Sequence, residues 1–192
     1  MGGMFTVEDL YVVAECVADA WRALVHRDWS VRAGTLEWTC LQTADHAIDT
    51  LIAPAFFLAS RRTDRYPEGG WHPGVDASPE QFVDAVLQGA RILGGVVSGS
   101  PADATALLFR NPPTLGVAAD FAPRGALELV IHAYDVCAGM GGDLQPPREA
   151  CEHLRQHVED WPFWGSYWPK LSMEGDPWVD LLTCSGRLAL TS

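Results

Sequence analysis

The sequence contains few basic residues. Its 192 residues include 13 Lys and Arg against 25 Asp and Glu, which gives a formal net charge of −12. A nucleic-acid partner requires a basic face that can meet the phosphates. The densest basic group, Arg61, Arg62 and Arg65, lies among acidic residues. We therefore expect no nucleic-acid partner.

Long apolar segments are also missing. A membrane-spanning helix needs about 18 or more successive apolar residues, whereas the longest candidate here, 51–59, is short and contains Pro54. The first residues lack the basic and apolar regions of a secretory leader and soon become acidic, at Glu8 and Asp9. We expect a cytoplasmic protein that has no membrane partner.

The cysteines form no recognisable framework. The five are odd in number, scattered and without CxxC spacing: Cys16, Cys40, Cys137, Cys151 and Cys184. This pattern favours free, mainly buried thiols in a reducing compartment over disulfides or a thiolate zinc site. The sequence also shows neither a phosphate-binding glycine loop nor a Ser-His-Asp arrangement.

Helical periodicity dominates what remains. Apolar residues recur every three or four positions in several segments, and three of these begin at helix-capping residues, Thr6, Thr39 and Ser78. We expect Pro54 to kink the second helix, because its ring displaces a backbone carbonyl. The helices predicted from these patterns span about 6–26, 39–60, 78–97, 123–139, 148–159 and 177–183.

These helices fit a single all-α domain over residues 1–192. The length suits one domain, and 48% hydrophobic residues can supply a sizeable core. Four long amphipathic helices joined by long connections predict a four-helix bundle with crossover loops and short extra C-terminal helices. The less regular segment 98–123 is expected to contain an extended piece at 107–109 and a loop at 111–113.

The helix around residues 127–136 carries a polar stripe on an otherwise apolar surface. Glu128 and His132 are four positions apart and project from one face, with Arg124 one turn before them and Asp135 one turn after. A carboxylate and an imidazole at this spacing can bind one divalent metal. Periodicity alone favours a solvent-exposed stripe, because an isolated E-x-x-x-H pair is common.

His46 is the candidate for a third ligand. It lies with Gln42, Asp49 and Thr50 on the polar side of the second helix, where a histidine is usually solvated. If the helices enclose a polar cleft, two imidazoles and a carboxylate form a facial set that leaves positions for water or substrate. Asp49 or Asp135 could then accept a hydrogen bond from the second imidazole nitrogen.

The other histidines are weaker candidates. His72 lies in a loop rich in Gly and Pro and could reach the edge of the site, although a surface position is favoured. His153 and His157 have the spacing of ligands, but their charged neighbours predict a solvated helix face. The aromatic segment 161–168 is expected to pack against the helix ends or, as an alternative, to wall an apolar substrate pocket.

Three motifs together resemble one protein family. Trp38-Thr39 followed by Ala44-Asp45-His46 is similar to the W-T…H signature of the mycothiol-dependent maleylpyruvate isomerase N-terminal domain, within the DinB-like superfamily. The E-x-x-x-H-x-x-D segment 128–135 and the ending 180–187, which closes on S-G-R, resemble later motifs of the same family. The resemblance spans about residues 5–187.

The resemblance implies a metal site and a class of chemistry. In that family a four-helix bundle binds a divalent metal, commonly zinc, and the ligands implied here are His46, Glu128 and His132. Ni²⁺ and Fe²⁺ also suit these ligand types. The implied activity is that of a transferase or isomerase that uses a low-molecular-weight thiol such as mycothiol with a small-molecule substrate. Maleylpyruvate isomerase has a further C-terminal domain, so we do not expect isomerisation of maleylpyruvate itself.

The sequence leaves a non-catalytic alternative open. In that interpretation the helical bundle binds a small ligand or a protein partner. The metal is then structural or absent. A closed fourth ligand, such as His72, would favour this alternative. In either interpretation the chain could form a homodimer.

Overall fold

The computed structural model describes residues 4–74, 76–159, 161 and 175–188. In this part the chain is mainly helical, as predicted, with one two-stranded sheet. Among the described residues, no helix is both long and apolar enough to cross a membrane. The elements are α1 (Val7–Arg22), α2 (Cys40–Ser60), α3 (Pro79–Ser98), β1 (Thr105–Arg110), β2 (Pro113–Val117), the 3-10 helix η1 (Ala118–Asp120), α4 (Phe121–Gly139), α5 (Arg148–Val158) and α7 (Pro177–Cys184).

Capping residues set where the first three helices begin. At α2 the hydroxyl of Thr39 accepts a hydrogen bond from the Gln42 N–H, and the Gln42 side chain accepts one from the Thr39 N–H. Thr6 caps α1 in the same reciprocal way, and at α3 the Gln81 side chain accepts a bond from the Ser78 N–H. These bonds satisfy N–H groups that a helix start leaves unpaired, and the three predicted starts are confirmed.

Two predicted helix bounds are wrong. α1 ends before residue 26, in turns where the Leu24 carbonyl accepts a hydrogen bond from the Trp29 indole at 3.0 Å. α4 begins at Phe121 rather than at Pro123, because η1 leads directly into it. Proline is tolerated there, since the first N–H groups of a helix have no intrahelical partner.

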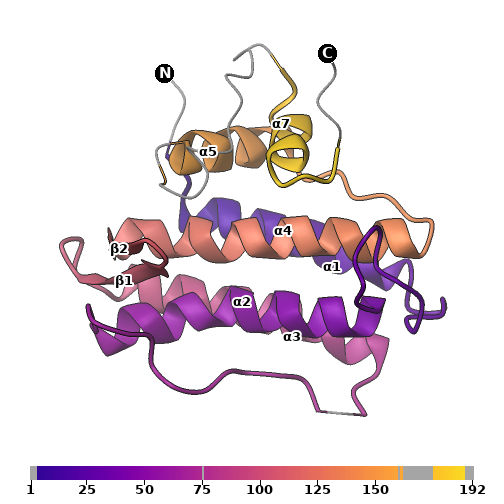
Figure 1. Cartoon of the computed structure of the whole chain (residues 1–192), viewed down its shortest axis with the longest axis horizontal. Coiled ribbons are helices and arrows are strands. Elements are labelled where there is room, and N and C mark those ends of the chain that lie inside the picture. Colours follow the sequence, from indigo (N-terminus) through magenta and orange to yellow (C-terminus); the bar gives the residue numbers. More distant parts are fainter. Residues whose placement is uncertain (1–3, 75, 160, 162–174, 189–192) are drawn as a thin grey trace.

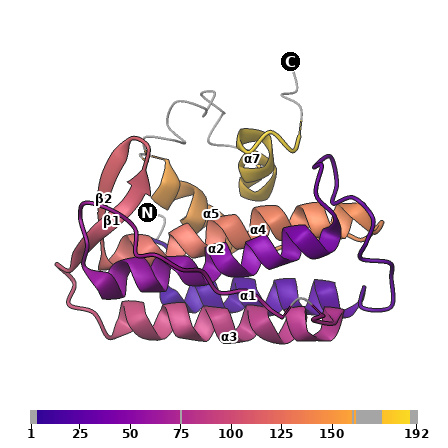
Figure 2. The same ribbon diagram turned by 60° about the horizontal axis from the view of Figure 1, so that its bottom comes forward.

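The four long helices lie side by side (Figures 1 and 2). α1 packs against α3 and α4, and α2 packs against the same two helices. Among the described residues, α1 and α2 are not one of the main packed pairs. The connection 23–39 therefore joins two helices that each pack mainly against α3 and α4.

Glycines allow α2, α3 and α4 to approach closely. A Cβ atom added at Gly125 of α4 would lie 2.5 Å from Cδ2 of Leu93 and 3.0 Å from the Leu51 carbonyl oxygen. A Cβ atom at Gly89 of α3 would lie 2.9 Å from Cγ1 of Ile52. These distances are shorter than non-bonded contacts of a carbon atom normally are, so larger residues at these positions would push the helices apart. The spacing matters because α2 and α4 carry the three candidate ligands.

Two smaller parts attach to the four long helices. β1 and β2 form an antiparallel hairpin beside the N-terminal end of α4, with Arg110 opposite Pro113 (Figure 1). The predicted extended piece is confirmed within β1, while the predicted loop is shorter than expected because Pro113 already belongs to β2. α5 and α7 pack against each other, and α5 also contacts α1 and α4.

The predicted solvated face of α5 is wrong. The side chain of His157 is only 2% exposed, and its Nε2 lies 2.9 Å from Oδ1 of Asp120 in η1. Nδ1 of His153 lies 3.1 Å from both carboxylate oxygens of Asp9 in α1. Trp161 packs edge-on against His157, and residues 162–168 of the predicted aromatic segment lie outside the described part. The partners of both histidines come from distant segments, so their own neighbours in sequence gave no sign of them.

Candidate metal centre

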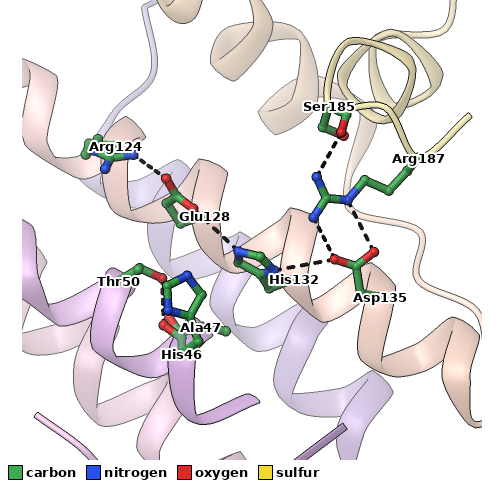
Figure 3. A network of polar contacts seen from close by, with 9 residues as sticks. All are labelled: His46, Ala47, Thr50, Arg124, Glu128, His132, Asp135, Ser185 and Arg187. Carbon is green, nitrogen blue, oxygen red and sulfur yellow. Dashed lines mark hydrogen bonds and ion pairs between the residues drawn. The ribbon is translucent and has the colours of Figure 1, made fainter. Parts of the chain in front are cut away.

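The polar stripe of α4 runs along the face that looks towards α2 and the C-terminal segment (Figure 3). The side chains of Arg124 and Glu128 are 19% and 27% exposed, and those of His132 and Asp135 are 13% and 2% exposed. The solvent-exposed stripe favoured by periodicity alone is therefore wrong. Periodicity shows which face of a helix is polar. It cannot show whether that face meets water or polar side chains of another helix.

α2 brings His46 to this stripe (Figure 3). The ring centroids of His46 and His132 lie 4.8 Å apart, and the rings meet edge to face at 78°. One possible ligand atom from each of His46, Glu128 and His132 lies within 4.8 Å of the other two. The fold thus collects the three residues that the family resemblance implied, from two helices far apart in sequence.

Glu128 is held as a carboxylate. Its Oε1 accepts a short hydrogen bond from Nη1 of Arg124, one turn earlier, and its Oε2 lies 3.6 Å from Nε2 of His132. Burial alone would raise the pKa of Glu128, but the hydrogen bond with His132 and the charge of Arg124 outweigh it and lower the pKa to about 2. Because Arg124 occupies one oxygen, the other remains directed towards the two imidazoles.

The two imidazoles have pKa values that shift in opposite directions. Burial lowers the pKa of His132, but its contacts with Asp135 and Glu128 outweigh that effect and the net pKa is raised. Burial lowers the pKa of His46 as well, and the nearby charge of His132 lowers it further. The two carboxylates therefore favour the charged form of His132, while burial and the charge of His132 favour the neutral form of His46.

Asp135 orients His132 from behind. Its Oδ2 lies 3.4 Å from Nδ1 of His132, close enough for an ion pair although not aligned for a hydrogen bond. Arg187 contacts both oxygens of Asp135, through Nε at 3.2 Å and Nη2 at 2.7 Å, and donates from Nη1 to the Ser185 carbonyl. A carboxylate on the Nδ1 side of a neutral imidazole favours the Nδ1-protonated tautomer, which leaves the lone pair of Nε2 on the side of Glu128.

The other residues considered at the sequence level lie apart from the three candidates. Oδ1 of Asp49 accepts a hydrogen bond from the Trp71 N–H at 2.9 Å, so this carboxylate fastens the loop after α2. Nδ1 of His72 lies 2.9 Å from Oδ2 of Asp45. Among the described residues, the cluster of possible metal ligands consists of the three candidates alone. His72 is therefore not a fourth member of the cluster.

The three donors suit a divalent metal ion. Donor atoms that share one zinc ion lie about 3.4 Å apart, because each is about 2.1 Å from a tetrahedral metal. The observed upper limit of 4.8 Å is longer than that separation, so the side chains would have to move together to share one ion. Two neutral imidazoles and one carboxylate are also a common donor set for zinc, nickel and ferrous iron.

A cavity of about 560 Å³ opens beside the cluster. Glu128 and His132 form part of its wall, and the turn after α7 forms another part through Ser185 and Arg187. The size is in the range of sites for small molecules. A ligand bound in this cavity would therefore reach two of the three candidate donors directly.

Two residues that no sequence pattern pointed to also line this cavity. Arg110, at the end of β1, and Tyr66, in the loop after α2, both line it. Neither belongs to a motif. Arg110 belongs to the hairpin, which lies beside the N-terminal end of α4 (Figure 1), and Tyr66 is joined to the hairpin by the hydrogen bond from its hydroxyl to the Leu108 carbonyl. Arg187 was quoted as part of the closing S-G-R motif but was given no role.

Comparisons of the chain with models of known protein families, with curated proteins and with solved structures found no match.

Proposed function

We propose that this protein is a DinB-like four-helix bundle that binds a divalent metal through His46, Glu128 and His132. Zinc is the expected ion, and the expected reaction is a transfer or isomerisation that uses a low-molecular-weight thiol such as mycothiol. The observation that carries the proposal is the approach of the three donors, from α2 and α4, to within 4.8 Å of one another beside a cavity. The order of the three motifs along the chain supports the same family.

The residues around the donors support metal binding in three ways. Arg124 holds one oxygen of Glu128 and leaves the other for the ion. Asp135 holds Nδ1 of His132 on the side away from Glu128. The lowered pKa of His46 keeps that imidazole neutral and able to donate its lone pair near pH 7. When a divalent ion is bound, it stabilises the deprotonated form of a coordinating thiol and so makes the thiol a nucleophile at neutral pH.

The cavity supports a catalytic role over a purely structural one. A structural zinc ion is closed off by four protein ligands, whereas a catalytic ion keeps at least one position for water or substrate. The cluster within the described residues supplies three ligands, and Glu128 and His132 also face the cavity. A thiol or a substrate could therefore reach an ion bound by these residues.

Metal content of the purified protein tests the proposal. The protein is produced without a histidine tag, and metals are measured by mass spectrometry in the wild type and in the variants His132→Ala and Glu128→Gln. We expect about one equivalent in the wild type and a loss of at least about tenfold in both variants, because two ligands bind far more weakly than three. His26→Ala, which changes an exposed histidine outside the site, is the matched control.

Two results would contradict the proposal. One is less than about a tenth of an equivalent of metal in wild-type protein after reconstitution with zinc. The other is an unchanged metal content in His132→Ala.

A separate experiment tests the thiol. The protein is loaded with Co²⁺ and mixed with mycothiol, and a thiolate-to-cobalt charge-transfer band is expected. Absence of that band would remove the thiol from the proposal while leaving the metal in place.

A further inference from the structure

The cavity beside the candidate metal centre differs in charge from the chain as a whole. The sequence has a formal net charge of −12. The cavity wall nevertheless contains three arginines, Arg110, Arg124 and Arg187, and one carboxylate, Glu128. A concave site with an excess of one charge sign concentrates ligands of the opposite sign. An anionic ligand would therefore require that at least one of these arginines has no carboxylate partner.

Two of these arginines are already paired. Arg124 donates to Glu128, and Arg187 contacts both oxygens of Asp135. Their charges are therefore compensated within the protein. They contribute to the positive surroundings of the cavity, but their carboxylate partners would have to be displaced before either could bind a ligand in the same way.

Arg110 is different. Its guanidinium carbon lies 4.8 Å from the centroid of the Tyr66 ring. Among the described residues, no carboxylate lies within ion-pair distance of it. Stacking on an aromatic ring uses the face of the guanidinium and leaves its in-plane N–H donors available. Tyr66 is itself fixed, because its ring stacks on Phe57 at 4.0 Å and its hydroxyl donates to the Leu108 carbonyl.

We propose that the substrate of this site is a small organic carboxylate whose carboxylate group binds Arg110; this inference rests on the proposed function. The planar guanidinium can donate two parallel hydrogen bonds to a carboxylate. The apolar part of the ligand then lies against Phe109 and Ile131, which also line the cavity. One unpaired arginine matches one carboxylate in charge, whereas a phosphate group, with a charge of about −1.5 to −2, would remain partly uncompensated.

Binding of hexanoate to the zinc-loaded protein tests the inference. Hexanamide has the same size and shape without the charge, and inorganic phosphate is titrated in parallel. By calorimetry we expect hexanoate to bind at least about tenfold more tightly than hexanamide or phosphate, which corresponds to one charge-assisted pair. Arg110→Gln is expected to remove that difference. Arg27→Gln, which removes the same charge from an exposed position outside the cavity, is the matched control.

Three results would overturn the inference. Hexanoate and hexanamide could bind equally, phosphate could bind as tightly as hexanoate, or Arg110→Gln could leave hexanoate binding unchanged. The last result would mean that the carboxylate binds the metal rather than Arg110. The same titrations with metal-free protein separate this inference from the proposed function. A preference for hexanoate that depends on Arg110 should persist there, since Arg110 is not one of the metal donors.

Discussion

Arg187 and Asp135 form a two-pronged ion pair that ties the segment after α7 to α4 (Figure 3). The side chain of Asp135 is 2% exposed and that of Arg187 is 17% exposed. Because Asp135 also faces Nδ1 of His132, the pair fixes the carboxylate that lies directly behind a proposed metal ligand. The C-terminal segment thus contributes to the geometry of a site whose donors all come from α2 and α4.

We expect Arg187→Ala to weaken zinc binding by about 10- to 100-fold, the usual effect of losing the support behind a metal-ligating histidine. Affinity is measured by competition with a chromogenic chelator. Arg148→Ala is the matched control, because Arg148 makes an exposed ion pair with Asp176 at 3.4 Å on the neighbouring helix. Arg187→Lys keeps the charge without the two-pronged geometry, so its zinc affinity should lie between those of Arg187→Ala and Arg148→Ala. Equal zinc affinity in folded Arg187→Ala and in the wild type would contradict this role.

The metal-free protein is expected to lose stability in acid partly through Glu128. The folded-state pKa of Glu128 is about 2, below its ordinary value of 4.5. The unfolded chain therefore binds this proton more readily, so the contribution of Glu128 is complete above pH 4.5 and is lost as the pH falls towards 2. Urea unfolding at a series of pH values measures it. In Glu128→Gln the loss between pH 5 and pH 3 should be smaller, and an equally steep loss would contradict the prediction.

His132 is expected to make the stability of the metal-free protein depend on pH above about 6.5. Its folded-state pKa is raised above the ordinary value of 6.5. Its contribution to stability is therefore complete below pH 6.5 and is lost as the pH rises through the folded-state value. Bound zinc should remove this dependence, because it takes the place of the proton. The measurement is the urea midpoint between pH 6 and pH 9, with and without zinc. If the urea midpoint depends on pH equally with and without zinc, zinc does not displace the proton of His132.

Gly125→Ala is expected to damage both stability and the site. The added Cβ would lie 2.5 Å from Cδ2 of Leu93 and 3.0 Å from the Leu51 carbonyl oxygen, so the Leu93 side chain must turn away and the backbones of α2 and α4 must separate by a few tenths of an ångström. We expect a loss of about 1–3 kcal/mol in the free energy of unfolding. Zinc affinity should fall as well, because the same movement separates His46 from His132.

The control for this change lies on α3. Nothing lies within 4 Å of a Cβ atom added at Gly95, so Gly95→Ala should stabilise the protein by about 0.5–1 kcal/mol. Both variants are compared by urea unfolding and by the chelator competition. Normal zinc affinity in Gly125→Ala would show that the spacing of α2 and α4 does not limit the site.

His157→Ala tests how α5 is attached. The substitution removes a 2% exposed imidazole and its 2.9 Å contact with Asp120, and we expect a loss of about 1–3 kcal/mol in the free energy of unfolding. His26→Ala, at an exposed position, should change it by no more than about 0.5 kcal/mol. Similar values for the two variants would mean that the histidine–aspartate contact adds nothing to the attachment of α5.

The secondary structure was largely predictable because its signals are local. Thr39 and Gln42 lie within one turn of each other, so the start of α2 follows from four residues. The end of α1 was harder, since the Leu24 carbonyl is taken by the indole of Trp29 in a turn that has no clear pattern. The attachment of α5 was not predictable, because the partner of His157 lies 37 positions earlier.

The candidate site was likewise predictable only where its residues are close in sequence. The spacing of Glu128 and His132 on one helix face followed from the sequence, since helical geometry fixes residues that are four apart. His46 was a candidate from its place on the polar side of its helix, but only the family resemblance joined it to Glu128 and His132. The arrangement of Arg110 over Tyr66 and the contact of Arg187 with Asp135 were outside the reach of sequence reasoning, because each joins residues from different elements.

By itself, the sequence determined which segments are helical and that Glu128 and His132 share a face, because both depend on interactions within a turn or two of the chain. The tertiary structure decided what that face meets. Helix packing, allowed by Gly125, sets α4 close to α2 and turns the polar stripe towards His46. A polar stripe looks the same in sequence whether water or another polar side chain covers it, and only packing between distant segments distinguishes the two.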